Sequence, residues 1–148
     1  FRPSGRPLGQ PVRLLAAAYF NATNDYPLRT LLEALRLLNH KPGAYRLIVA
    51  GKIEAPSGAA WLNELARSYG VGGDVDYRGP YGPADAPSVF AQADIFLHLK
   101  HNDPCPSAVL EAMASGLPMV HGATGGTPEL VGDSGVALPV ERSQSWME

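Results

Sequence analysis

The alternation of short apolar runs with stretches of helical periodicity restricts the possible folds of this chain more than any other feature. Six apolar runs predict buried strands, over residues 12–19, 45–50, 75–78, 94–99, 117–121 and 135–140. Between them the pattern predicts three helices over residues 27–39, 84–93 and 108–115. Two further helices are expected: one is capped by Ser57 and ends near Tyr69, and a short one is capped by Thr127. Such βαβ units predict an α/β, Rossmann-like, doubly wound sheet of six parallel strands in the order 3-2-1-4-5-6, with helices on both faces.

One stretch carries two carboxylates, Asp103 and Glu111, which are eight positions apart. Pro104 and Pro106 keep the residues before them extended, so Asp103 should lie in a loop. Ser107 is a favourable N-cap, so Glu111 should lie in the first turns of the helix that follows.

Glu111 allows two interpretations. A carboxylate near a helix N-terminus is stabilised by the helix dipole, typically by about 0.3–1 kcal/mol, and needs no further role. The same helix end offers backbone N–H groups to an anion, so the amides could hold phosphates while Glu111 accepts hydrogen bonds from ribose hydroxyls. The second interpretation predicts a nucleotide site.

The loops that follow the first five predicted strands cover residues 20–26, 51–57, 79–83, 100–107 and 122–127. Ligands of doubly wound sheets bind outside the carboxyl ends of the strands. All five loops should therefore meet at one crevice, which brings Asp103 and Glu111 together with the glycine-rich turns.

Composition excludes several classes of protein. The length of 148 residues fits one domain, and a net charge of −2 without a basic block argues against a nucleic-acid partner. One cysteine excludes an internal disulfide and a cysteine-rich zinc site. No apolar run approaches the ~20 residues of a membrane span. Residues 1–10, rich in proline and glycine, are expected to form a linker or frayed N-terminus of a longer protein.

The run from Asp103 to Gly135 resembles the nucleotide-sugar-binding half of retaining glycosyltransferases of the two-domain GT-B type, family four, also called glycosyl transferases group 1. The family pattern is an acidic residue, seven residues, Glu-Ala-Met-Ala-x-Gly-x-Pro-Val, a Gly-Gly pair, and a Glu three positions later. Here the pattern reads Asp103, Glu111-Ala-Met-Ala-Ser-Gly-Leu-Pro-Met119, Gly125-Gly126 and Glu129. Looser similarity at residues 47–51, 75–79 and 93–97 extends the resemblance over nearly the whole chain.

The resemblance implies roles for individual residues. Asp103 and Glu111 would be the catalytic pair. Asp103 would contact a hydroxyl of the donor sugar, and Glu111 would bind the ribose. The remaining donor-binding residues would be Ser107, Ala108, Val109 and Leu110 at the diphosphate, Gly79, Pro80 and Tyr81 near the base, and Gly125 with Gly126.

The sequence departs from the family pattern in the first loop. Relatives place an Arg and a Lys there, facing the leaving diphosphate, but the corresponding positions fall near Asn21 and Tyr26. Diphosphate contacts would then come from Asn21, Arg29, Lys52 or Lys100, or from the partner domain. The first acidic residue is also Asp103 where the family usually has Glu.

The resemblance implies a cytoplasmic hexosyltransferase-like enzyme that moves a sugar from a nucleotide-sugar donor to an acceptor with retention. Residues 11–148 would form the donor-binding domain, and an N-terminal domain of the same chain, absent here, would bind the acceptor. We expect no cofactor and no metal, because Asp74-Val-Asp76 lies at the wrong edge for the crevice, and we expect no turnover by this fragment alone.

Two alternatives stay open. One is a degenerate nucleotide- or sugar-binding module without transferase activity, which the missing basic residues favour and Glu111 opposes. The other is a nucleotide-sugar epimerase on the same scaffold. A Rossmann dehydrogenase is disfavoured because the loop at residues 20–26 contains no glycine for a dinucleotide fingerprint.

Overall fold

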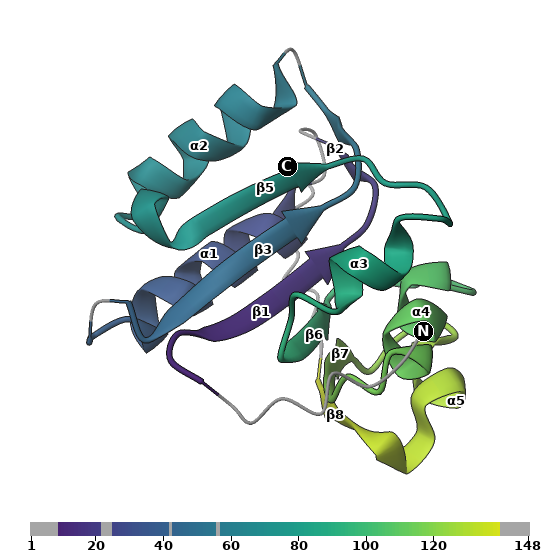
Figure 1. Ribbon diagram of the computed structural model, residues 1–148. Coiled ribbons are helices and arrows are strands. Elements are labelled where there is room, and N and C mark those ends of the chain that lie inside the picture. The colour runs from purple at the N-terminus through teal and green to yellow at the C-terminus, as the bar shows by residue number, and fades with distance from the viewer. Residues whose placement is uncertain (1–8, 22–24, 42, 56, 140–148) are drawn as a thin grey trace.

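The computed structural model describes residues 9–21, 25–41, 43–55 and 57–139. Its main sheet has six strands, all parallel, in the order β5-β3-β1-β6-β7-β8 (Figure 1). These strands are β1 (Val12–Ala17), β3 (Tyr45–Ala50), β5 (Val75–Gly79), β6 (Ile95–His98), β7 (Met119–Gly122) and β8 (Gly135–Leu138). Read along the main-sheet strands only, this is the predicted order 3-2-1-4-5-6, so the predicted fold class is confirmed.

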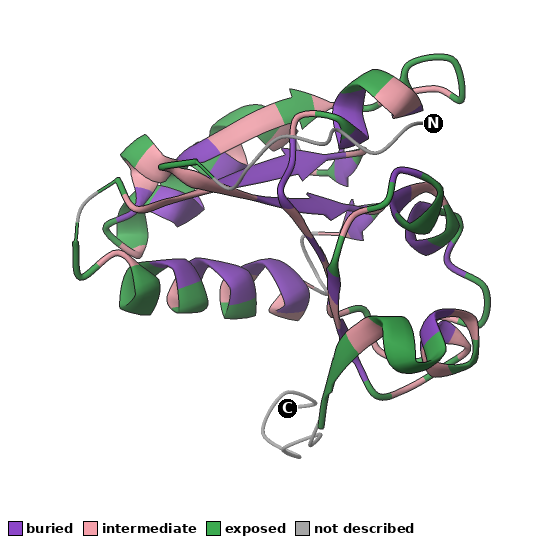
Figure 2. Cartoon of the chain, turned by 60° about the horizontal axis from the view of Figure 1, so that its bottom comes forward, coloured by how far each residue is buried: buried purple, intermediate pink, exposed green. Residues whose placement is uncertain are grey.

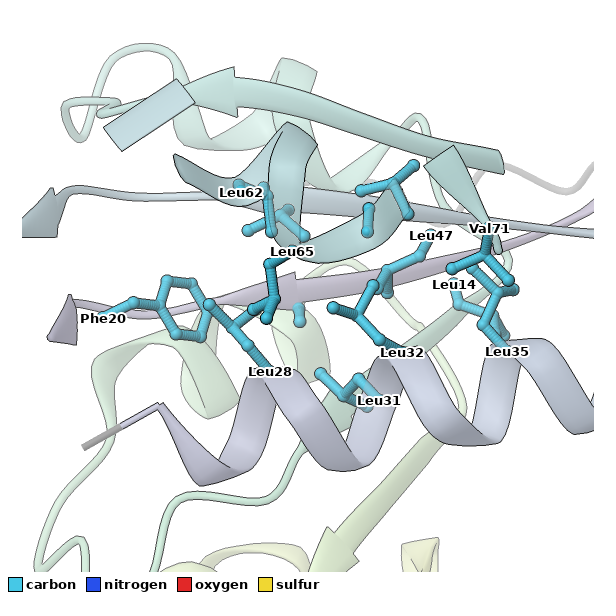
Figure 3. Packing of buried hydrophobic residues seen from close by; sticks show 14 of the residues in the cluster. Leu14, Phe20, Leu28, Leu31, Leu32, Leu35, Leu47, Leu62, Leu65 and Val71 are labelled. Atoms are coloured by element: carbon cyan, nitrogen blue, oxygen red, sulfur yellow. The ribbon is translucent and has the colours of Figure 1, made fainter. Parts of the chain in front are cut away.

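Helices cover both faces of the sheet. They are α1 (Tyr26–Leu38), α2 (Gly58–Ser68), α3 (Ala86–Phe90), α4 (Ser107–Ala114) and α5 (Thr127–Val131), with single 3-10 turns at Gly72–Asp74 and Gly132–Ser134. Leucines of α1 and α2 pack with Leu14 and Leu47 on one face (Figure 3). On the other face, α3, α4 and α5 pack with Leu15 and Ile48. The central strands of the sheet are thus buried between two helical layers, whereas the edge strand β8 is mostly exposed (Figure 2).

Alternate residues of the central strands supply the two cores. Along β1, Leu14 and Ala16 belong to the α1–α2 core, whereas Leu15 and Ala17 belong to the core under α3, α4 and α5. Successive side chains of a strand point to opposite faces, so a strand buried on both sides must be apolar throughout. The apolar runs of the sequence are therefore the direct signal of this sandwiched sheet.

The structure also differs from the prediction in local details. The first strand was predicted to run to Tyr19 but ends at Ala17, and β2 (Phe20–Asn21) pairs with β4 (Ile53–Glu54) in a separate parallel ladder. That ladder occupies part of the predicted loops, where it draws the chain segments after β1 and β3 together.

Two of the three predicted helix caps are wrong. Ser57 does take the predicted N-cap position of α2, in a left-handed conformation, but its side chain makes no capping hydrogen bond. Ser107 and Thr127 are the first helical residues of α4 and α5, so Pro106 and Gly126 take the N-cap positions. α4 and α5 therefore each begin one residue earlier than predicted.

Within the part of the chain that the structure describes, no helix is long and apolar enough to cross a membrane.

Candidate functional site

Both acidic residues follow the predicted placement. Asp103 lies in the loop between β6 and α4, and Glu111 lies on α4, where its side chain is half-buried. Because β6 is parallel to its neighbours, this loop lies at the carboxyl edge of the sheet. The edge is where doubly wound sheets bind ligands.

The Glu111 carboxylate is held by a tyrosine. The Tyr81 hydroxyl, in the loop after β5, donates a hydrogen bond of 2.9 Å to Glu111 Oε2. Burial raises the pKa of Tyr81 well above its usual value, and the hydrogen bond to Glu111 and its negative charge raise it further. The phenol therefore stays protonated and remains a donor at physiological pH. The family resemblance placed Tyr81 near the base of the nucleotide but did not predict its contact with Glu111.

The Asp103 carboxylate is held by charged and ionisable groups. Lys100 Nζ lies 3.1 Å from Asp103 Oδ2, and the buried His98 Nε2 lies 3.8 Å from the same oxygen. Burial lowers the pKa of His98, with Lys100 and His121 also lowering it and Asp103 acting in the opposite direction. His98 is therefore neutral at pH 7, and Lys100 supplies the positive charge beside Asp103.

The loop that carries Asp103 is locked to the glycine turn after β7. The Gly126 amide donates to the Asp103 carbonyl oxygen at 2.9 Å. A Cβ at Gly125 would lie 2.4 Å from that oxygen, and one at Gly126 would lie 2.0 Å from the Pro104 oxygen. Asn102 N also donates to Thr124 Oγ1 at 3.2 Å. The glycine pair therefore has a structural reason, because the two backbones meet where no side chain fits.

A row of aromatic rings joins the surroundings of the two carboxylates. The Tyr81 ring meets Phe90 edge-on with centroids 6.1 Å apart, and Phe90 lies 5.6 Å from Phe96. Phe96 in turn stacks on His98 at 6.4 Å. Phe90 and Phe96 are fully buried. The row thus runs through the core under α3 and α4 from Tyr81, the partner of Glu111, to His98, the neighbour of Asp103.

The remaining predicted donor contacts fall into two groups. Ser107, Ala108, Val109 and Leu110 form the first turn of α4, where Ala108 and Val109 are buried and the Leu110 side chain is exposed. Gly79 ends β5 with a positive φ of 74°, and its carbonyl accepts a 2.8 Å hydrogen bond from the Gly51 amide. Pro80 is exposed beside it.

Of the four residues predicted to contact the diphosphate, only Lys100 lies beside one of the two acidic site residues, Asp103. Asn21 Nδ2 donates to Glu54 Oε2 at 3.4 Å, and Arg29 Nε donates to Asp25 Oδ2 at 2.9 Å. Lys52 Nζ lies 5.8 Å from the centre of the Tyr19 ring.

Tyr26, which stands near a position where the family has a cation, ties the first loop to the Asp103 loop. Its hydroxyl donates to the Leu99 carbonyl oxygen at 3.1 Å and accepts a hydrogen bond from the His101 amide. Near the position where the family pattern has a cation, Tyr26 therefore forms neutral hydrogen bonds that connect the two loops. The sequence pattern did not indicate this role.

The Asp74 and Asp76 carboxylates lie at the start of β5, at the opposite edge from Glu111, as the sequence predicted. Asp74 Oδ2 accepts a 3.0 Å hydrogen bond from Asn39, and Asp76 pairs with Arg46 at 3.0 Å. No group of three or more His, Cys, Asp or Glu side chains in the described ranges could hold a metal ion.

An all-parallel α/β sheet with helices on both faces and two carboxylates at its carboxyl edge defines a Rossmann-like domain. The sequence model of the family described as glycosyl transferases group 1 matches residues 11–148, and the chain belongs to this family.

Curated relatives carry the name D-inositol 3-phosphate glycosyltransferase. The protein of this name from Saccharomonospora viridis is 30% identical over 164 aligned positions, which cover 100% of this chain and 38% of that protein. The one from Actinosynnema mirum is 33% identical over 76% of this chain and 28% of that protein. The chain therefore spans little more than a third of the first of these relatives and less of the second.

Solved structures share the fold. Anabaena HepE, described in complex with UDP and glucose, has a TM-score of 0.66 and 23% identity over 86% of this chain and 34% of its own. The C-terminal domain of the group 1 glycosyl transferase LpcC from Francisella tularensis has a TM-score of 0.65 and 20% identity over 90% of this chain and 70% of its own. The sheet matches the Rossmann-like domains of GT-B glycosyltransferases.

Proposed function

We propose that residues 11–148 form the donor-binding domain of a retaining, two-domain, family-four glycosyltransferase. The domain would bind a nucleotide sugar, and an N-terminal domain of the same protein would bind the acceptor in the cytoplasm. The observation that carries the proposal is the placement of Glu111, on a helix at the carboxyl edge of the sheet, beside the loop of Asp103. Family membership supports the transfer of a sugar, and the relatives' greater length supports a second domain.

In the proposed site each carboxylate has one function. Glu111 accepts hydrogen bonds from the ribose hydroxyls, and Asp103 accepts one from a hydroxyl of the donor sugar. The first turn of α4 presents backbone amides to the diphosphate, as helix N-termini do for anions. Lys100, 3.1 Å from Asp103, supplies a positive charge at the same loop.

The substitution Glu111→Gln tests this proposal. It keeps the size of the side chain and removes its charge, and a hydrogen bond to a charged group contributes about 1.5–3 kcal/mol. We expect nucleoside diphosphate affinity to fall about ten- to a hundredfold in calorimetric titration. Thermal stability should change little, because a helix-dipole contribution is smaller. The control is Glu64→Gln, an exposed glutamate on α2. Unchanged affinity in Glu111→Gln, with a small loss of stability, would instead support the dipole role.

We further propose that donor binding needs no metal ion, since the diphosphate would be held by amides and side chains. Excess chelator should leave nucleotide affinity unchanged in the same titration, and loss of affinity would contradict this.

The second candidate function is a binding module without transferase activity. The observation that favours it is Tyr26, which braces the first loop to the Asp103 loop near a position where the family pattern has a cation. Nucleotide-sugar turnover by the full-length protein with an acceptor extract decides between the two. The isolated 148 residues should be inactive in either case.

A further inference from the structure

We propose that Tyr81 is a positioning residue, whose hydroxyl orients the Glu111 carboxylate so that the site distinguishes ribose from a sugar without the 2′- and 3′-hydroxyls. This inference rests on the proposed function of Glu111 as a ribose ligand. It adds a residue of the loop after β5 to the specificity of a site otherwise formed by α4.

The geometry supports an orienting role. Tyr81 and Glu111 are 30 positions apart in the sequence, and the 2.9 Å hydrogen bond joins the loop after β5 to α4. A glutamate side chain on a helix surface is free to sample several rotamers, and ordering it on ligand binding costs conformational entropy. A partner that fixes the carboxylate beforehand reduces this cost.

The hydrogen bond leaves acceptor sites for a ligand. An ionised carboxylate has about four lone-pair sites on its two oxygens. Tyr81 uses one of them, on Oε2. Oε1 and the second site of Oε2 remain for two vicinal hydroxyls, so Tyr81 supports ribose binding and does not compete with it.

The tyrosine itself is firmly placed. Its ring is half-buried and meets the fully buried Phe90 edge-on, and Phe90 packs on Phe96 in the core. Because burial raises the pKa of Tyr81, the hydroxyl remains a donor over the whole physiological range. Tyr81 therefore acts as a fixed support of constant protonation.

The experiment is the substitution Tyr81→Phe in the full-length protein, which removes the hydroxyl and keeps the ring contact with Phe90. UDP, GDP and ADP are titrated first, and the one that binds best is compared with its 2′,3′-dideoxy form. We expect the variant to bind the ribonucleotide about three- to tenfold more weakly than the native protein. Affinity for the dideoxynucleotide should be the same in both proteins.

Tyr77→Phe is the matched control. The Tyr77 hydroxyl also makes one hydrogen bond of 2.9 Å, to the Gly51 carbonyl oxygen, but meets no carboxylate. It should lower thermal stability about as much as Tyr81→Phe but leave the native preference for the ribo form over the dideoxy form unchanged. A second measurement is Tyr81→Phe in a Glu111→Gln background, where removing the hydroxyl should weaken ribonucleotide binding less than it does in the native protein.

The outcomes separate this inference from the proposed function. An equal loss for both nucleotides, unchanged affinity, or tighter ribonucleotide binding in Tyr81→Phe would overturn the positioning role, while Glu111→Gln could still lose affinity. If the native protein binds none of the three ribonucleotides, or Glu111→Gln binds as well as the native protein, the proposed function and the inference both fail.

Discussion

The two carboxylates of the candidate site are supported in opposite ways. Asp103 lies in a loop and is approached by Lys100 and His98, so charge and backbone contacts fix it. Glu111 lies on a helix and receives a hydrogen bond from a neutral phenol. The difference indicates that Asp103 depends on how two loops fit together, whereas Glu111 depends on one side-chain contact. Substitutions in the two regions should therefore differ in their effects.

The largest effect is expected from Gly126→Ala. The backbone of Gly126 has an ordinary negative φ of −84°, so its substitution tests steric contact alone. The new Cβ would lie 2.0 Å from the Pro104 carbonyl oxygen, and the two loops would have to separate. We expect a loss of about 3 kcal/mol in the free energy of unfolding, measured by urea denaturation. Gly73→Ala is the control, because a Cβ there meets nothing within 4 Å. Equal stability of the two variants would contradict the interlocked loops.

A smaller and more selective effect is expected from Asp103→Asn. If Asp103 contacts the donor sugar, the variant should bind a nucleotide sugar about tenfold more weakly, or about 1.4 kcal/mol. Binding of the matching nucleoside diphosphate should stay the same, in contrast to Glu111→Gln, which should weaken both. The exposed Asp133→Asn serves as the control in calorimetric titrations. Equal losses for both ligands would remove the assigned division between the two carboxylates.

The smallest effect is the pH dependence of His98. Burial is the main reason why its pKa is lowered below the ordinary value of 6.5. Below that pH the unfolded chain binds more protons than the folded one, so stability present above 6.5 is lost as the pH falls. Lys100 and His121 strengthen this effect, and Asp103 weakens it.

His98→Phe removes the titration and keeps a ring to stack on Phe96. Between pH 7.5 and pH 5, thermal unfolding should show a smaller loss of stability in this variant than in the native protein. The exposed His40→Gln should behave like the native protein. An equal acid-induced loss in His98→Phe would show that His98 is not responsible.

Much of the fold could be predicted from the sequence, because strands buried on both faces must be apolar along their whole length. β3 was predicted with its observed bounds, and the strand order followed from the βαβ pattern. The β2–β4 ladder could not be predicted, since two residues per strand are too few to show a period. The N-caps of α4 and α5 were predicted one residue too late, because tertiary contacts of the loops set where these helices begin.

The candidate site was predicted only in part. The spacing of Asp103, Glu111 and the glycine pair matches the family pattern, and the site was predicted from this match. The contacts of Tyr81 with Glu111 and of His98 with Asp103 could not be read from the sequence, since each depends on the three-dimensional approach of separate elements. In the sequence, Tyr26 indicated only that a basic residue of the family pattern is missing. In the structure its hydroxyl forms a hydrogen bond that connects two loops.

The close backbone contact between Gly125–Gly126 and Asp103–Pro104 has a consequence for protein engineering. A chimera that takes residues 99–106 from a relative but keeps residues 122–126 would join two backbones shaped for different neighbours. Changing the donor preference by loop exchange therefore requires both segments to be transplanted together, as one unit of design.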